Sequence, residues 1–181
     1  MNRKNEITLG LVQMGMTADK GKNLDKAVKI IGDAARKGAQ IVCLPELFNS
    51  LYFPQEEKFD AKNIAEPIPG ATTKALSEAA RESRIILIGG SICEIAGNKL
   101  FNTTVVFDQK GKIIGKYRKI HVPHDPHFYE QNYFKKGYLG YQIVDMPVAK
   151  IGTLILLLIG KTLIARCWLS CFERSFLFFN C

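Results

Sequence analysis

The first residue that could do chemistry is Glu46, which follows the apolar run AQIVCLP of residues 39–45. Such a run is typical of a strand buried on both faces, and α/β sheets place their sites at the carboxyl ends of such strands. A carboxylate there is desolvated, which raises its pKa and suits a general base. A solvent-exposed acid at a strand end explains the position equally well, so position alone leaves both interpretations open.

The second candidate is Lys119, in the basic segment GKYRKIHVP of residues 115–123. This segment ends a predicted strand, and one of its basic side chains could point inward. A lysine held there would stabilise a developing oxyanion as a fixed positive charge. The alternative is a solvated edge strand whose basic residues all face water.

The histidines form a third feature, because all of them fall in one short segment with an aspartate among them: His121, His124, Asp125 and His127. Imidazole and carboxylate groups are good zinc ligands. However, two prolines make this segment extended and turning, which does not bring three rings to one point. We therefore predict no metal site here, and keep a small His-rich metal-binding module as an alternative.

The elements that must position these residues follow from hydrophobic periodicity. Residues 7–11 alternate as in a strand with one face on a core. Helical spacing follows, with Asn23 as a candidate cap at its start and Gly38 at its end. The run before Glu46 is the next strand, and residues 48–70 are a loop-rich excursion.

The middle of the chain predicts a second helix from Thr72 to Ser83 and then three strands within residues 85–120. Tight turns are expected at Gly97-Asn98 and at residues 108–111. The order strand–helix–strand–helix–strand–strand–strand indicates an α/β (α+β) fold with a mixed sheet and helices on one face.

Composition narrows the class of protein. The chain has 181 residues and a formal net charge of +8, with Lys and Arg spread through nearly every segment. No nucleic-acid motif accompanies them, so we expect a solvated basic surface and no nucleic-acid partner. The apolar run between Lys150 and Lys161 is shorter than the about 20 residues that span a membrane, so no membrane partner is expected. The polar N-terminal stretch lacks a signal-like apolar region, and we expect a cytoplasmic protein.

Three segments together resemble the nitrilase superfamily of carbon–nitrogen hydrolases. Residues 9–48, from LGLVQMG to CLPELF, are similar to its opening strand, first helix and glutamate motif. Residues 100–123, LFNTTVVFDQKGKIIGKYRKIHVP, are similar to its lysine motif. Residues 125–145 resemble the loop of its N-carbamoylputrescine amidase branch, although residues 135–138 (KKGY) depart from that pattern.

The resemblance implies the N-terminal portion of a four-layer α-β-β-α sandwich over residues 5–155. It also implies hydrolysis of a non-peptide C–N bond through a covalent thioester, without a cofactor. Glu46 would be the base, Lys119 would stabilise the tetrahedral intermediate, and Glu130 would be the second glutamate of the site. His124, Asp125 and Tyr129 would contact the substrate, a small amide or an N-carbamoyl amine of polyamine metabolism. Relatives pair as homo-oligomers through this sandwich, an expectation that we do not extend to this chain.

The nucleophile of the family is missing from its expected place. Residues 150–155, KIGTLI, resemble the strand that delivers a cysteine, but Leu156 follows, and leucine has no nucleophile. Residues 156–181 show no clean periodicity, and we interpret them as an aberrant tail produced by a frameshift or truncation. We therefore expect an inactive chain, a catalytically dead fragment or pseudoenzyme, unless Cys167 replaces the nucleophile.

Overall fold

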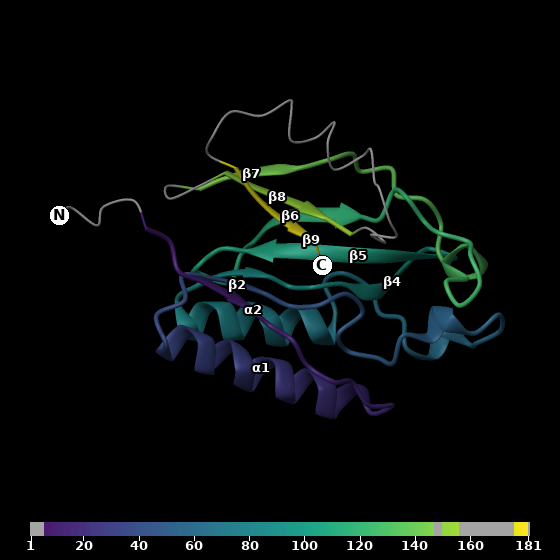
Figure 1. Ribbon diagram of the computed structural model, residues 1–181, viewed down its shortest axis with the longest axis horizontal. Coiled ribbons are helices and arrows are strands. Elements are labelled where there is room, and N and C mark those ends of the chain that lie inside the picture. Colours follow the sequence, from purple (N-terminus) through teal and green to yellow (C-terminus); the bar gives the residue numbers. More distant parts are fainter. Residues whose placement is uncertain (1–5, 147–149, 156–175, 181) are drawn as a thin grey trace.

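The computed structural model describes residues 6–146, 150–155 and 176–180. Their helices and strands are, in chain order, β1 (Leu9–Leu11), α1 (Lys20–Arg36), β2 (Ile41–Cys43), α2 (Ala71–Ser83), β3 (Ile86–Ile88), β4 (Ile92–Ala96), β5 (Lys99–Phe107), β6 (Ile113–Arg118), β7 (Ile143–Asp145), β8 (Lys150–Leu154) and β9 (Phe176–Asn180). Short 3-10 helices are η1 (Phe53–Gln55), η2 (Ala61–Asn63) and η3 (Glu130–Asn132). The helices, a larger sheet and a smaller sheet lie one above another (Figure 1).

Within these residues the larger sheet has six strands in the order β1-β2-β3-β5-β4, with β6 also paired to β5. Strands β1, β2 and β3 are parallel, whereas β5 runs antiparallel to β3, β4 and β6. The predicted mixed sheet is thus confirmed. Strand β2 is buried along its whole length, as its uninterrupted apolar sequence predicts.

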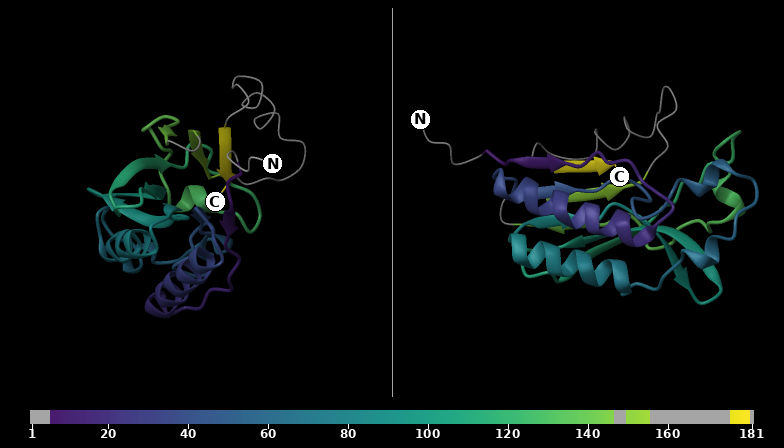
Figure 2. Two further views of the ribbon diagram at one scale, coloured as in Figure 1. Left: turned by 90° about the vertical axis from the view of Figure 1, so that its left-hand side faces the viewer. Right: turned by 90° about the horizontal axis from the view of Figure 1, so that it is seen from below.

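Helices α1 and α2 cover one face of this sheet (Figure 2). Their apolar sides pack on the sheet through residues that include Ile31 and Leu76. Helix α1 starts earlier than predicted, because Asp19 is its N-cap and accepts a hydrogen bond from the backbone N–H of Lys22. Asn23 is instead buried inside the first turn, where it hydrogen-bonds to the backbone of Thr17.

The segment IILIGGSICEI, residues 85–95, is the first of the three strands predicted within residues 85–120, but it forms two strands, β3 and β4. Gly90 interrupts it with a φ of +58°, and a Cβ there would lie 2.3 Å from the carbonyl oxygen of Pro45. Only glycine fits such a close approach with that backbone angle. The predicted turns at Gly97-Asn98 and before Gly111 are both present, and both glycines have positive φ.

Strand β1 forms as predicted, but its apolar side chains do not enter the core. Leu9 is 39% exposed and Leu11 is 71% exposed. Gly10 faces α1, since a Cβ on it would meet the side chain of Ala34 at 3.2 Å. Alternation correctly indicates a strand, but it cannot tell which face of an edge strand is covered.

The second sheet, of β7, β8 and β9, packs on the face of the larger sheet opposite the helices. Val144, Ile151 and Leu154 form a core with residues of β2, β3 and β6. Strand β9, inside the segment interpreted as an aberrant tail, pairs in parallel with β8, a strand that the sequence pattern did not predict. Residues 156–175 and 181 lie outside the described residues.

Candidate active site

Glu46 lies in the turn that follows β2, and this turn contacts the short link between β3 and β4. Its neighbour Leu47 is buried with a φ of +47°, a strained angle for a residue with a Cβ. The backbone N–H of Leu47 donates to the side chain of Ser91 at 3.0 Å, and the carbonyl of Pro45 packs against Gly90. The link between β3 and β4 therefore fixes the turn that presents Glu46.

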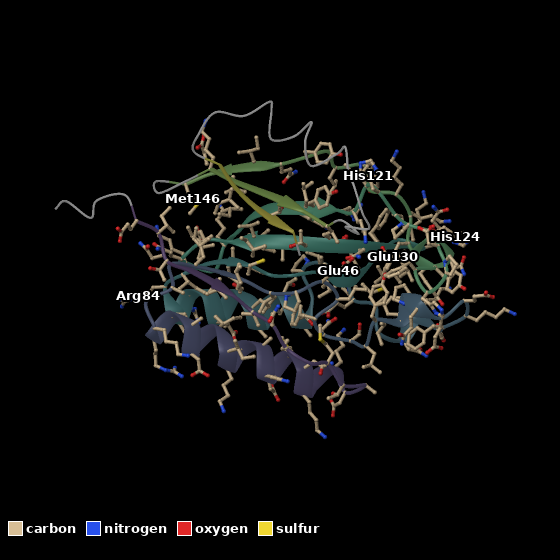
Figure 3. All side chains as sticks on the ribbon, viewed as in Figure 1. Glu46, Arg84, His121, His124, Glu130 and Met146 are labelled. Atoms are coloured by element: carbon tan, nitrogen blue, oxygen red, sulfur yellow. The ribbon has the colours of Figure 1, made fainter. Side chains whose placement is uncertain are left out.

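Lys119 joins the two predicted glutamates into one site. Its Nζ lies 2.9 Å from Oε1 of Glu46 and 2.7 Å from Oε1 of Glu130. The side chains of Lys119 and Glu130 are each only 1% exposed, whereas that of Glu46 is 22% exposed. Figure 3 shows Glu46 and Glu130 converging at the same end of the larger sheet. The predicted lysine thus points inward and bridges two carboxylates.

The electrostatics favour proton transfer at Glu46. Burial raises the pKa of Glu46, and the negative charge of Glu130 adds to this rise, while Lys119 opposes it. Hydrogen bonds from Lys119 and Asn102 both reach Oε1 of Glu46, at 2.9 and 2.7 Å. In the described part of the chain no hydrogen bond reaches its other oxygen, Oε2, so that oxygen is free to accept a proton.

Glu130 starts η3 and is bound by Tyr52 from the loop before η1. The hydroxyl of Tyr52 donates to Oε1 of Glu130 at 2.8 Å. Burial raises the pKa of Tyr52, and the charge of Glu130 adds to this, so the hydroxyl stays protonated as a donor. Oε2 of Glu130 is buried and has no hydrogen-bond partner within the described residues.

The predicted substrate-binding residues lie farther out. His124 and Asp125 are exposed and Tyr129 is half-buried; the rings of His124 and Tyr129 are 6.0 Å apart. Figure 3 shows His124 at the margin of the molecule, beyond Glu130. Tyr129 precedes Glu130 in the chain, and its backbone N–H donates to the carbonyl of Pro54 in η1 at 2.7 Å. The substrate roles of these three residues stay predictions.

The histidines do not converge. His121 contacts the hydroxyl of Tyr141 at 3.2 Å, and all three histidines are exposed. Among the residues that the structure describes, no group of three or more His, Cys, Asp or Glu is arranged to hold a metal ion. The geometry gives no support to a His-rich metal module.

Sequence reasoning missed two residues of this site, Asn102 and Tyr52. The sequence does point to Asn102, because it is an amide inside the predicted strand LFNTTVVF, and a buried amide needs a hydrogen-bond partner. Nothing in the sequence points to Tyr52, since it lies in a loop far from Glu130 along the chain. We call Glu46, Asn102, Lys119 and Glu130 together the inner cluster.

A second polar group, also missed, comes from β4, β5 and β6 and lies on the face of β5 opposite Asn102. Glu94 is 2% exposed and accepts hydrogen bonds from Arg118 (2.8 and 2.7 Å), Lys116 (2.6 Å) and Thr103 (2.7 Å). Burial alone would raise the pKa of Glu94, but these donors lower it to about 2. We call these four residues the outer cluster.

Two further sequence expectations concern the C-terminal part and the membrane. Leu156, at the expected place of the nucleophile, and Cys167 both lie outside the described residues. In the ranges that the structure does describe, no helix is long and apolar enough to cross a membrane.

Known proteins with similar sequences include omega-amidases. The chain is 43% identical over 156 residues to omega-amidase NIT2-B of Xenopus laevis, covering 81% of this chain and 53% of that protein. It is 40% identical over 153 residues to human omega-amidase NIT2, covering 80% and 52%. The chain thus spans about half the length of these curated relatives. They support an amidase, but they do not support the narrower prediction of an N-carbamoylputrescine amidase or a place in polyamine metabolism.

Solved structures share the fold. A carbon-nitrogen hydrolase from Helicobacter pylori G27 superposes with a TM-score of 0.74 at 31% identity, covering 82% of this chain and 51% of that one. Nit3 of Saccharomyces cerevisiae, a member of branch 10 of the nitrilase superfamily, gives a TM-score of 0.70 at 32% identity, covering 82% and 55%. The family model for carbon-nitrogen hydrolases matches residues 8–166, on both sides of Leu156. The chain therefore belongs to the carbon-nitrogen hydrolase family.

Proposed function

We propose that the inner cluster is the acid–base and electrostatic part of an amidase site for a small molecule with an omega-amide group. The observation that carries this proposal is the buried Nζ of Lys119, which bridges Glu46 and Glu130 at 2.9 and 2.7 Å. A lone buried cation between two carboxylates is an unbalanced arrangement, and perturbed, closely packed titratable groups are typical of reactive sites. The names of the curated relatives support the omega-amide as substrate.

Glu46 has the properties of the general base. Its side chain is more exposed than that of Glu130, the other carboxylate bound by Lys119. Its Oε2 accepts no hydrogen bond in the described part of the chain. A carboxylate with a raised pKa takes a proton more readily at neutral pH than an ordinary one. It would remove the proton of the attacking group and return it to the leaving ammonia as the C–N bond breaks.

Lys119 has the properties of the oxyanion partner. An ammonium group has three N–H donors, and two of them point at Glu46 and Glu130. Within the residues that the structure describes, no hydrogen bond uses the third, and it would bind the oxygen of the amide carbonyl, which becomes negative when the nucleophile adds. Because Lys119 is buried, that charge interaction is stronger than it would be in water.

The covalent step requires a thiolate that attacks the amide carbon, expels ammonia and leaves a thioester for water to hydrolyse. With leucine at position 156, this chain has no thiol at the place where the family resemblance puts it. We therefore expect the chain as it stands to bind the amide without turning it over. A thiol supplied by Cys167 is the alternative.

Restoring the thiol tests the proposal directly. We expect Leu156→Cys in the full chain to release ammonia from glutaric acid monoamide, and the unchanged chain to release none. Adding Glu46→Gln should lower that rate at least about 100-fold, the usual contribution of a general base. N-carbamoylputrescine serves as the competing substrate, and the ratio of the two rates decides the substrate class.

Each other outcome has a definite meaning. If Leu156→Cys is folded and inert toward both compounds, the proposed function is wrong. If the unchanged chain is active and Cys167→Ser abolishes that activity, Cys167 is the nucleophile and the expectation of inactivity is wrong. An intact-mass adduct with an electrophilic amide analogue identifies the reacting thiol in either case.

A further inference from the structure

Asn102 lies on β5 with its side chain in the inner cluster. It is 1% exposed, and it pairs with Cys93 of β4. Because side chains alternate along a strand, Asn102 shares its face with Thr104 and Val106 and faces away from Thr103. Val106 packs against Val144 and Ile151 of the second sheet, so Asn102 points between the two sheets.

Asn102 holds both halves of the Glu46–Lys119 pair. Its side-chain N–H donates to Oε1 of Glu46 at 2.7 Å. Its backbone carbonyl accepts the backbone N–H of Lys119 at 2.8 Å. One buried residue thus fixes the carboxylate on one side and the backbone of the lysine on the other.

This arrangement distinguishes the two oxygens of Glu46. Oε1 accepts from both Asn102 and Lys119, whereas Oε2 has no hydrogen bond within the residues that the structure describes. Rotation that exchanged the two oxygens would have to break two short hydrogen bonds, one of them to an ammonium, and bonds to charged groups are the stronger ones. The carboxylate is therefore held in one orientation.

We propose that Asn102 is a positioning residue, which anchors Oε1 of Glu46 and thereby reserves Oε2 for proton transfer. The catalytic meaning of this role rests on the proposed amidase function, but the anchoring itself does not. Neither half of the proposal assigns Asn102 a contact with substrate.

A purely structural role explains Asn102 less well. Its side-chain Oδ1 is buried without a partner in the described part of the chain, and such an atom is destabilising. An apolar residue, like Val105 and Val106 farther along β5, would fill the strand without that penalty. What an apolar residue lacks is the N–H that Asn102 donates to Glu46.

The experiment measures the titration of Glu46 in the full chain by carbon-13 NMR of labelled glutamate, with Glu46→Gln used to assign the signal. A hydrogen bond to the ionised carboxylate lowers its pKa, and Asn102 contributes in that direction. We expect Asn102→Leu, which has no donor, to move the Glu46 midpoint about 1 pH unit higher. Asn102→Asp keeps the shape, loses the donor and adds a negative charge, so it should move the midpoint further.

Thr104→Val is the matched control, because Thr104 is buried on the same face of β5 and its hydroxyl has no partner among the described residues. It should leave the Glu46 midpoint unchanged. If Asn102→Leu and Asn102→Asp are folded and also leave it unchanged, the proposal is wrong, whatever the hydrolysis assay shows.

A measurement on the unchanged chain decides the matter if the variants do not fold. The side-chain amide signals of Asn102 should shift with the same midpoint as Glu46, because protonation weakens the acceptor. If the chemical shifts of the Asn102 side-chain amide do not change as Glu46 titrates, the proposal is wrong. Absence of hydrolysis in Leu156→Cys, with the amide signals coupled to Glu46, would reject only the proposed function.

Discussion

The inner and outer clusters lie on opposite faces of the sheet at β5, to which they contribute Asn102 and Thr103 respectively, and they differ in how their charges balance. In the outer cluster one carboxylate, Glu94, meets two cations and a hydroxyl, and both of its oxygens accept two hydrogen bonds. In the inner cluster one cation, Lys119, meets two carboxylates, and an oxygen of Glu130 is buried without a partner among the described residues. In the outer cluster every carboxylate oxygen thus has hydrogen-bond donors, whereas in the inner cluster the carboxylates outnumber the cation that binds them.

The difference appears in the proton affinities. Although burial opposes it, hydrogen bonding lowers the pKa of Glu94 to about 2, whereas burial raises the pKa of Glu46. A satisfied ion pair is chemically inert and stabilises the fold only while complete. A group with an unpaired oxygen and a raised pKa can exchange protons. We therefore expect the outer cluster to be a structural network and the inner cluster, as proposed above, to be the reactive group.

The largest expected effect is loss of stability on breaking the outer cluster. Glu94→Gln should lower the free energy of unfolding by about 3–5 kcal/mol, because it leaves Arg118 buried beside a neutral amide whose N–H group also faces a cation. Urea unfolding at pH 7 measures this. Glu82→Gln, at an exposed position of α2, should change the same quantity by less than about 0.5 kcal/mol. A loss below 1 kcal/mol for Glu94→Gln would remove the distinction between the clusters.

The second effect is on how the free energy of unfolding falls at acidic pH. The pKa of Glu94 is about 2 in the folded chain against an ordinary 4.5. Its stabilisation is therefore present above about pH 4.5 and is lost as the pH falls toward 2. The lost contribution is about 3 kcal/mol. Unfolding followed from pH 6 to pH 2 should show this decline in the unchanged chain and a smaller one in Glu94→Gln; equal slopes would contradict it.

The third effect tests whether the clusters share one backbone. Gly137 donates its N–H to the carbonyl of Lys119 at 2.9 Å, and a Cβ on it would lie 2.1 Å from the carbonyl oxygen of Arg118. Gly137→Ala must displace this backbone, at about 1–3 kcal/mol, and should perturb NMR signals of both clusters. Gly15→Ala, where a Cβ meets nothing within 4 Å, is the control. Perturbation of only one cluster would show that they move independently.

The smallest effect is on stability at the inner cluster. The pKa of Glu46 is raised in the folded chain, so its contribution to stability is present below its ordinary value and is lost as the pH rises through the folded value. Glu46→Gln removes this loss and keeps an acceptor for Asn102 and Lys119. The free energy of unfolding at pH 7 should stay within about 1 kcal/mol or rise. A loss as large as that of Glu94→Gln would make the inner cluster structural.

Much of the fold followed from local sequence. The buried strand before Glu46, the helix that ends at Ser83 and the turn at Gly97 depend on periodicity and on glycine, which are properties of neighbouring residues. The predictions were wrong where contacts between residues distant in sequence determine the structure. Gly90 splits a strand because the Pro45 carbonyl lies against it, and Leu11 is exposed because it sits on an edge strand.

The sequence by itself determined the family resemblance and the identity of Glu46, Lys119 and Glu130 as candidates, because motifs record residue type and order. Only the tertiary structure decided which charges meet. Arg118 and Lys119 are adjacent in sequence, yet the alternation of a strand sends them to opposite clusters. Arg118 pairs with one carboxylate and Lys119 with two, because the loops and strands that carry these carboxylates lie far away along the chain. Proton affinity follows from those partners and from burial, which no local pattern contains.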